Sequence, residues 1–157
     1  MIVKGIIDED FVNYKKPAMT IEMPYCSFKC DKDCGEPICQ NSNLIFIPNI
    51  EIEVNKLVER YISNPITKAV VFQGLEPFDS FEELYDFCVT LRYFCDDDIV
   101  IYTGYKEEEI EEKVINLLSD LGNIIIKFGR FIPNSLHKFD SILGVELASD
   151  NQYAKFI

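Results

Sequence analysis

The amino-acid sequence predicts an α/β fold in which a parallel sheet is covered by crossover helices. Four apolar runs with β-branched residues alternate with three segments whose apolar residues recur at helical spacing. Strands that alternate with helices in this way are typical of a parallel sheet. The chain has 157 residues, which is long enough to bury a core, and we expect a single domain over residues 1–157.

The elements of the first half follow from short sequence patterns. The apolar run over residues 18–24 predicts a strand that leads into a cysteine-rich loop, and residues 44–47 predict a short extended or buried segment. A helix is expected over about residues 50–62, because apolar side chains recur there at helical spacing, namely Val54, Leu57, Val58, Tyr61 and Ile62. Residues 68–73 predict a buried strand, and Gly74 begins the turn after it.

The second half continues the alternation. Ser80 followed by Glu83 is the pattern of a capping box, which predicts a helix from residue 80 to about residue 94. The remaining elements are expected as a strand, a helix, a strand and a loop with an extended tail, over residues 98–103, 106–121, 123–131 and from 140 onward. The glutamates of the third helix gather near its amino end, where the helix dipole favours negative charge.

Four of the six cysteines lie within fourteen residues after the first strand, at Cys26, Cys30, Cys34 and Cys39. A strand-end loop with four thiols suits a soft metal centre, either an iron–sulfur cluster or zinc. Three residues separate Cys26 from Cys30 and Cys30 from Cys34, and four separate Cys34 from Cys39. None of these gaps is the two-residue gap of zinc knuckles and ribbons, so the spacing favours a cluster over a structural zinc site.

Three further short sequences follow the other predicted strands, at residues 74–77 (GLEP), 103–105 (TGY) and 129–131 (GRF). In parallel sheets the chemistry gathers at the carboxyl ends of the strands. We therefore expect these turns and the cysteine loop to form one site. Glu76 would lie opposite the cysteines, where its carboxylate could receive an ammonium group.

Charge and composition exclude several classes of function. The net charge is −12, because 27 Asp and Glu stand against 15 Lys and Arg. Such a surface repels phosphate backbones and anionic membranes, so we expect neither nucleic acid nor membrane as a partner. No apolar run approaches the length of a membrane span, and the amino terminus (MIVKGIIDED) turns acidic too early for a secretory signal. We expect a cytoplasmic protein, in which clustered thiols stay reduced and act as ligands.

With these motifs in this order, the chain resembles a small radical S-adenosylmethionine (radical SAM) enzyme. It is most similar to the activating proteins of anaerobic ribonucleoside-triphosphate reductases, over nearly the whole chain. Residues 74–77 stand where that family has a Gly-Gly-Glu/Asp-Pro turn, and residues 102–106 (YTGYK) match its aromatic-Thr-Gly-Tyr-Lys strand end. Residues 129–132 (GRFI) echo a Gly-Lys/Arg-Phe segment, and residues 151–152 echo a Ser-Asn-Gln near the carboxyl terminus.

This resemblance implies a partial (β/α) barrel with a parallel sheet that holds a [4Fe–4S] cluster on three cysteines. The fourth iron is then free for the amino and carboxylate groups of S-adenosylmethionine, which the reduced cluster cleaves to methionine and a 5′-deoxyadenosyl radical. The implied partners are a glycyl radical enzyme, namely an anaerobic ribonucleotide reductase, and an electron donor such as flavodoxin or ferredoxin. By position, the implied cofactor-binding residues are Gly74, Glu76, Thr103 and Tyr105.

The chain departs from the family pattern at three places. The family has two residues between its second and third cysteines, whereas here the gap is three residues to Cys34 or eight to Cys39. We prefer Cys26, Cys30 and Cys39 as ligands, with Cys34 as the alternative to Cys39, because Ile38 and Asn41 match the residues expected around the third cysteine. In addition, Leu75 replaces the second glycine of the turn, and Phe128 replaces an aspartate.

Two other functions remain open on the sequence alone. A radical SAM enzyme could act on a small molecule instead of a protein partner. The four cysteines could also form a structural zinc site in a module that catalyses no reaction.

Overall fold

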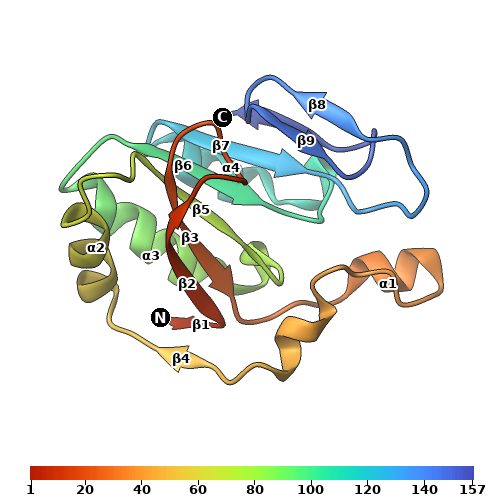
Figure 1. Cartoon of the computed structure of the whole chain (residues 1–157), viewed down its shortest axis with the longest axis horizontal. Coiled ribbons are helices and arrows are strands. Elements are labelled where there is room, and N and C mark those ends of the chain that lie inside the picture. The colour runs from red at the N-terminus through yellow and green to blue at the C-terminus, as the bar shows by residue number, and fades with distance from the viewer.

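The computed structural model describes residues 1–157 and centres on a six-stranded sheet with the strand order β10-β7-β6-β5-β3-β2 (Figure 1). Its four central strands are parallel to one another: β3 (Ala18–Met23), β5 (Ala69–Gly74), β6 (Asp98–Tyr102) and β7 (Ile124–Phe128). The edge strands β2 (Gly5–Asp10) and β10 (Tyr153–Phe156) run antiparallel to their neighbours. The predicted fold class, an α/β partial barrel with a largely parallel sheet, is confirmed.

The helices α2 (Val54–Ile62), α3 (Phe81–Arg92) and α4 (Glu112–Ser119) bury their apolar side chains against one face of this sheet. They share a core cluster with alternate residues of the strands, for example Val70 and Phe72 of β5. The helical side chains in this core are Leu57, Val58, Tyr61, Leu84, Phe87, Cys88, Leu91 and Leu118. None of the helices combines the length and the apolar character that a membrane crossing requires.

The opposite face of the sheet changes from apolar to polar along the strands. Its smaller core cluster includes Val71, Val100 and Ile125 from the strands, and Leu147 from the hairpin of β8 (Lys138–Asp140) and β9 (Val145–Leu147). Two residues further along each strand, alternation brings polar side chains to the same face. The register pairs Glu22 with Gln73 and Tyr102 with Lys127, so these four side chains form a polar row across β3, β5, β6 and β7.

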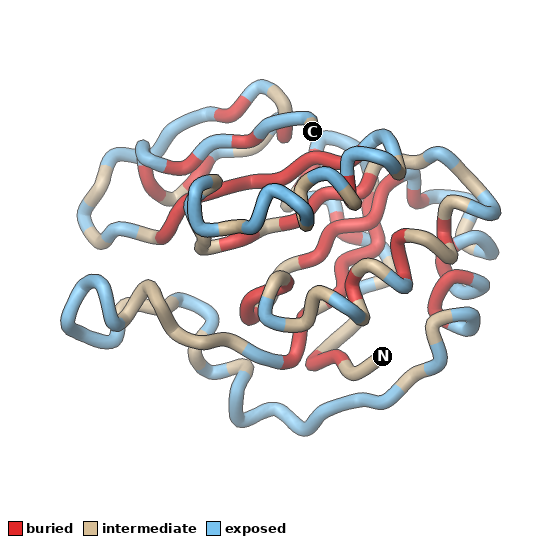
Figure 2. Tube along the Cα trace, turned by 180° about the vertical axis from the view of Figure 1, so that it is seen from behind, coloured by how far each residue is buried: buried red, intermediate tan, exposed pale blue.

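The segment between β3 and α2 lies outside this core. It contains the short helix α1 (Lys29–Cys34), the 3-10 helix η1 (Ser42–Phe46) and β4 (Ile50–Glu51), which pairs with β1 (Ile2–Val3). None of residues 25–56 is buried, and Figure 2 shows this segment in tan and pale blue beside the red strands. Hydrogen bonds tie it to the body, as where the Lys4 ammonium donates to the carbonyl oxygens of Ile45 (3.2 Å) and Ile47 (2.6 Å).

Two predictions for the first half of the chain were wrong in their local detail. Residues 44–47 lie largely in η1 instead of an extended segment. The helix expected from residue 50 begins only at Val54, because Ile50 and Glu51 pair with β1. In addition, no strand was predicted at the amino terminus, where β1 and β2 form.

In the second half, the predicted capping box and the long third helix do not form. The Ser80 side chain makes no cap hydrogen bond, and the Glu83 carboxylate accepts the amide of Ile2 (3.1 Å) instead. The helix expected over residues 106–121 is divided into a 3-10 turn, η3 (Glu107–Glu109), and α4. The Glu109 carboxylate accepts the Lys106 amide (2.8 Å), which satisfies η3 as a separate turn.

Candidate functional site

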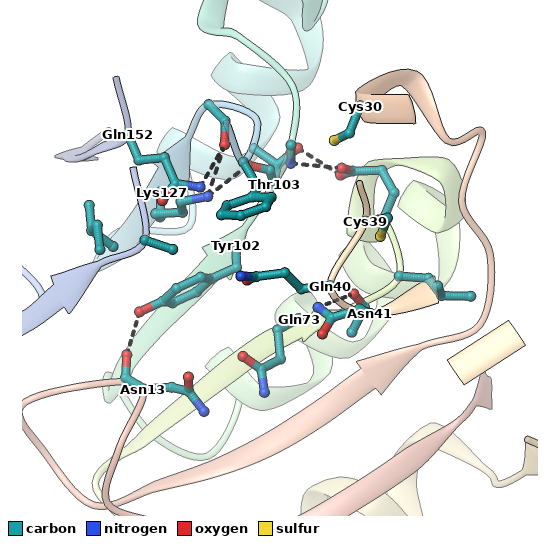
Figure 3. A pocket seen from close by; sticks show the side chains of 18 of the residues that line it. Asn13, Cys30, Cys39, Gln40, Asn41, Gln73, Tyr102, Thr103, Lys127 and Gln152 are labelled. Carbon is teal, nitrogen blue, oxygen red and sulfur yellow. Dashed lines mark hydrogen bonds between the residues drawn. The ribbon is translucent and has the colours of Figure 1, made fainter. Parts of the chain in front are cut away.

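A cavity of about 420 Å³ opens at the carboxyl ends of the four parallel strands, within the size range of pockets that hold one small ligand. Its wall takes residues from the cysteine loop and from all three turns that the sequence singled out (Figure 3). The predicted convergence on one site is therefore confirmed. The residues from these four segments are Cys26, Cys30, Cys39, Gly74, Leu75, Glu76, Thr103, Gly104, Gly129 and Phe131.

Three of the four loop cysteines line this cavity. Cys26, Cys30 and Cys39 are partly buried, and burial is the main cause that raises the pKa of each thiol, that of Cys26 to about 12. A negative charge on Cys39 also raises the pKa of Cys26 and of Cys30. Cys34 is exposed, lies off the cavity wall and has its Sγ 4.0 Å from Glu36 Oε1.

The backbone around the cysteines adopts a conformation that needs support from its surroundings. Phe28, between Cys26 and Cys30, lies in the left-handed region with φ 53°, and its amide donates to Cys26 Sγ at 3.2 Å. Such strain in a non-glycine residue is concentrated at functional sites. On the facing turn, a Cβ at Gly104 would lie 3.1 Å from Cys30 Sγ. The absence of a side chain at Gly104 therefore allows β6 to approach the thiol closely.

Glu76 is the buried acid of the site, only 4% exposed. Its Oε1 accepts from Thr103 Oγ1 (2.7 Å) and from the Phe78 amide (3.1 Å), and its Oε2 accepts from the Gly104 amide (2.9 Å). Burial raises the pKa of Glu76 to about 7, although these three donors act in the opposite direction. The contacts fix the carboxylate on the cavity wall close to the cysteines.

Thr103 and Tyr105 have different positions, although both belong to the predicted cofactor-binding turn. Thr103 is buried on the cavity wall and accepts the Tyr105 amide at 2.9 Å. The Tyr105 side chain lies outside the wall, where its hydroxyl donates to Asp79 and contacts Ser27 Oγ at 3.1 Å. Tyr105 therefore braces the start of the cysteine loop, and a direct cofactor contact by this residue stays a prediction.

Lys127 is a site residue that was not predicted from the sequence. It is 7% exposed, and its ammonium donates to the carbonyl oxygens of Gly129 (2.9 Å) and Thr103 (3.4 Å) on the cavity wall (Figure 3). Burial lowers the pKa of Lys127 to about 8, while the charges of Glu76 and Cys30 raise it. A lysine in the middle of an otherwise apolar strand, IIIKF, was the available signal.

Arg130 and the carboxyl-terminal segment support the same wall from outside. The Arg130 guanidinium donates to both oxygens of Glu109 (2.6 and 2.8 Å), and its Nε lies 2.8 Å from Asp33 Oδ2 on α1. Asn151 Nδ2 donates to the Arg130 carbonyl oxygen (3.0 Å), and Gln152 Nε2 donates to that of Gly129 (3.2 Å). Of this group only Gln152 lines the cavity.

Comparison with known families identifies the class of this chain. A family described as a 4Fe-4S single cluster domain matches residues 18–151, from the start of β3 to beyond β9. The chain belongs to this family. A comparison with curated proteins gives no match.

The 4Fe-4S single cluster domain is typical of radical SAM activases, which act on glycyl radical enzymes. The cofactors of this radical SAM-type chain are a [4Fe–4S] cluster and S-adenosylmethionine. No group of three or more His, Cys, Asp or Glu side chains is gathered closely enough to hold a single metal ion.

The residues of the cavity fit both cofactors. Iron in such clusters binds cysteine thiolates, and the three thiols that line the cavity are the groups that would hold the cluster. Beside the thiols lie a buried carboxylate, Glu76, and a buried ammonium, Lys127. These opposite charges suit the ammonium and the carboxylate of a methionyl group.

Proposed function

We propose that this chain is a radical SAM activase that forms a glycyl radical on a partner enzyme, an anaerobic ribonucleotide reductase. The observation that carries the proposal is the meeting of three cysteines with the Glu76 turn at one end of the cavity. Cys26, Cys30 and Cys39 are the proposed cluster ligands. The exposed position of Cys34, off the cavity wall, supports Cys39 over Cys34 as the third ligand.

The side chains around the thiols hold the methionyl end of S-adenosylmethionine. Glu76 receives its ammonium, and the hydrogen bonds from Thr103 and Gly104 keep the carboxylate oriented for that contact. The Lys127 ammonium donates two hydrogen bonds, to the carbonyl oxygens of Gly129 and Thr103, and its third N–H group is available for the methionyl carboxylate. Gly74, on the same wall, lets the chain turn there with φ 93°.

When bound, the reduced cluster would supply one electron for cleavage of the sulfonium–C5′ bond of S-adenosylmethionine to methionine and a 5′-deoxyadenosyl radical, and a donor such as flavodoxin or ferredoxin would reduce the cluster. A glycine of the partner would then lose its Cα hydrogen atom to this radical, which would leave a glycyl radical on the partner and 5′-deoxyadenosine. The fixed carboxylate and ammonium orient the sulfonium, and the apolar wall residues Leu75 and Phe131 exclude water from the radical.

Exposed apolar residues near the cavity favour a protein as the partner. Val12 and Leu44 line the cavity, and large apolar residues close to them in the sequence face solvent: Phe11 is 64% exposed and Phe46 is 85% exposed. Exposed apolar side chains that gather around a site are typical of protein contact surfaces. A partner that inserts a glycine loop into the cavity would cover them.

The direct test of the function is a spin-resonance measurement. The anaerobic, cluster-loaded chain is mixed with reductant, S-adenosylmethionine and a glycyl radical enzyme that is encoded beside it or co-purifies with it. We expect a glycyl doublet on the partner and none when the radical-site glycine is changed to alanine. No doublet, together with turnover of a small molecule, would contradict the proposed partner.

The ligand set is tested by iron and sulfide assays after anaerobic reconstitution. We expect Cys26→Ala, Cys30→Ala and Cys39→Ala to lose the cluster, and Cys34→Ala to keep about four irons per chain. Loss in Cys34→Ala alone would assign the third ligand to Cys34. A colourless wild-type protein with one tightly bound zinc would favour the structural zinc module.

Glu76→Gln tests the cofactor contact. A hydrogen bond to a charged group contributes roughly 1.5–3 kcal/mol, so we expect the affinity for S-adenosylmethionine to fall about tenfold to a hundredfold. Equilibrium binding to the cluster-loaded variant measures this, and release of 5′-deoxyadenosine with dithionite measures turnover. Glu36→Gln, at an exposed residue off the wall, is the matched control. Normal affinity and turnover in Glu76→Gln would remove this role.

A small-molecule substrate is the second candidate, and the polar row on the sheet favours it. Glu22, Gln73 and Tyr102 line the cavity as well and could contact the polar groups of a small substrate. If that candidate is right, Gln73→Leu will reduce turnover of the substrate and leave the affinity for S-adenosylmethionine unchanged.

A further inference from the structure

We propose that Asp31 is a positioning residue that fixes Cys39 at the cavity. This inference rests on the proposed function in one respect, the assignment of Cys39 as the third cluster ligand. Asp31 does not touch the cavity wall itself. It acts through the main chain on either side of the thiol that does.

The Asp31 carboxylate joins the two ends of the long segment between Cys30 and Cys39. Its Oδ1 accepts the amides of Ile38 and of Cys39, each at 2.9 Å, and so joins residue 31 to residues seven and eight positions later. The Asp31 carbonyl oxygen also accepts the amide of Gly35 at 2.9 Å, where the backbone turns with φ 77°. A single residue therefore holds both the turn after α1 and the return of the chain to Cys39.

The loop needs such a restraint because burial does not supply one. Eight residues separate Cys30 from Cys39, and none of them is buried. A segment of this kind has many conformations open to it, and each places the Cys39 sulfur differently. The two charge-assisted hydrogen bonds that the Asp31 carboxylate accepts select the conformation in which Cys39 joins Cys26 and Cys30.

A second anchor lies beyond the thiol and makes the restraint specific to Cys39. Asn41 Nδ2 donates to the Gly74 carbonyl oxygen at 2.9 Å and so ties the chain to the end of β5. Cys39 lies between the amides that Asp31 accepts and the contact of Asn41 with Gly74. Cys34 lies in the middle of the loop that Asp31 closes, and neither anchor holds it. The same geometry that brings Cys39 to the cavity leaves Cys34 exposed.

Three variants separate positioning from general folding. Asp31→Ala removes the acceptor, whereas Asp31→Asn keeps an oxygen that can accept both amides. Asp33→Ala is the matched control on the same short helix, because Asp33 contacts Arg130 and makes no contact with the loop end. In the cluster-free chains, the rate of alkylation of each cysteine is followed by mass spectrometry. In the reconstituted chains, iron content and the rate of iron release to a chelator are measured.

We expect Cys39 in Asp31→Ala to be alkylated about tenfold faster than in the wild type, with Cys26 and Cys30 unchanged. The same variant should release iron about tenfold faster, while Asp31→Asn and Asp33→Ala behave like the wild type. Equal alkylation and iron release in Asp31→Ala and the wild type would overturn the inference. The alkylation comparison needs no cluster, so a wild type that takes up no iron would refute the proposed function and still decide the role of Asp31.

Discussion

At the scale of single residues, the buried charges on the cavity wall have the highest cost for the fold. Glu76 and Lys127 are both more than nine-tenths buried, and transfer of an ion from water to the interior is unfavourable unless partners replace the lost hydration. Glu76 has three protein donors, whereas the protein acceptors of the Lys127 ammonium are two carbonyl oxygens. A bound anion would therefore compensate the Lys127 charge, which has fewer protein partners than the Glu76 charge.

Lys127→Met tests this role by separating affinity from stability. Methionine keeps most of the length of the side chain and removes the charge, so we expect the affinity for S-adenosylmethionine to fall about tenfold or more. The free energy of unfolding should fall by about 1–3 kcal/mol, because the carbonyl oxygens of Thr103 and Gly129 lose this donor. Calorimetric titration and urea unfolding measure the two effects. Lys155→Met, at an exposed ion pair with Glu107, should change neither affinity nor turnover. Wild-type affinity in Lys127→Met would show that Lys127 does not bind the cofactor.

Sequence patterns predict some residues of the site and not others, and the difference has a physical cause. The cysteines and Glu76 stand in turns directly after strands, where the chain order alone brings them to one edge of the sheet. Lys127, Tyr102 and Gln73 lie within strands, and their meeting depends on the register between strands that are distant in the sequence. The choice between Cys34 and Cys39 depends on hydrogen bonds in a loop with no periodic pattern.

At the scale of elements, the close approach of β3 and β5 depends on Gly74. Gly74 has φ 93°, and a Cβ there would lie 3.0 Å from the Glu22 Cα and 3.1 Å from the Met23 amide nitrogen. We expect Gly74→Ala to lower the free energy of unfolding by about 3 kcal/mol or more, because backbone strain and a backbone clash combine. Gly122→Ala is the control: its φ is 67° and no atom lies within 4 Å of its added Cβ, so about 1 kcal/mol is expected. Urea unfolding checks both values, and equal losses would contradict the close approach.

The ion pair between η3 and the turn after β7 makes a pH-dependent contribution to stability. Hydrogen bonds from Arg130, and its charge, lower the pKa of Glu109 from 4.5 to about 2. A carboxyl group with a lowered folded-state pKa stabilises the fold above its unfolded pKa and loses this contribution as the pH falls through its folded pKa. The loss therefore falls between about pH 4.5 and pH 2.

Glu109→Gln should accordingly destabilise the cluster-free chain by about 1 kcal/mol at pH 7, a value reduced for solvent screening. At pH 3 we expect the difference from the wild type to shrink by about half, because the unfolded wild type is then protonated at residue 109. Urea unfolding at the two pH values measures it, with Glu108→Gln as the control at the neighbouring residue. A difference that does not depend on pH would show that the pair acts through packing and not through charge.

Element boundaries were predicted well where burial decides them and poorly where hydrogen bonds compete. The strands β5, β6 and β7 lie within two or three residues of their predicted ends, because long β-branched runs have few alternatives to a buried strand. The capping box does not form because the Glu83 carboxylate accepts the amide of Ile2 instead. Ile2 is distant in the sequence, so no local pattern can predict this contact. The third helix was shortened because Glu109 closed its own turn.

At the scale of the whole molecule, stability is distributed unevenly between the sheet and the cysteine segment. The four parallel strands are almost entirely buried, whereas residues 25–56 include no buried residue. Regions with little buried surface open locally at much lower free energy than a core. A cluster on Cys26, Cys30 and Cys39 would cross-link this segment, and a group that binds only the folded arrangement stabilises it.

Hydrogen exchange should reveal this distribution. In the cluster-free chain we expect the amides of β3, β5, β6 and β7 to exchange slowest and those of residues 26–47 to exchange fastest, because the segment opens without disturbing the core. Cluster loading should slow residues 26–41 strongly and the sheet only slightly. The control is Cys26→Ala treated with the same iron and sulfide, in which the segment should stay fast. If residues 26–47 of the cluster-free chain exchanged as slowly as β5, the segment would belong to the same cooperative unit as the core, and the uneven distribution of stability would be contradicted.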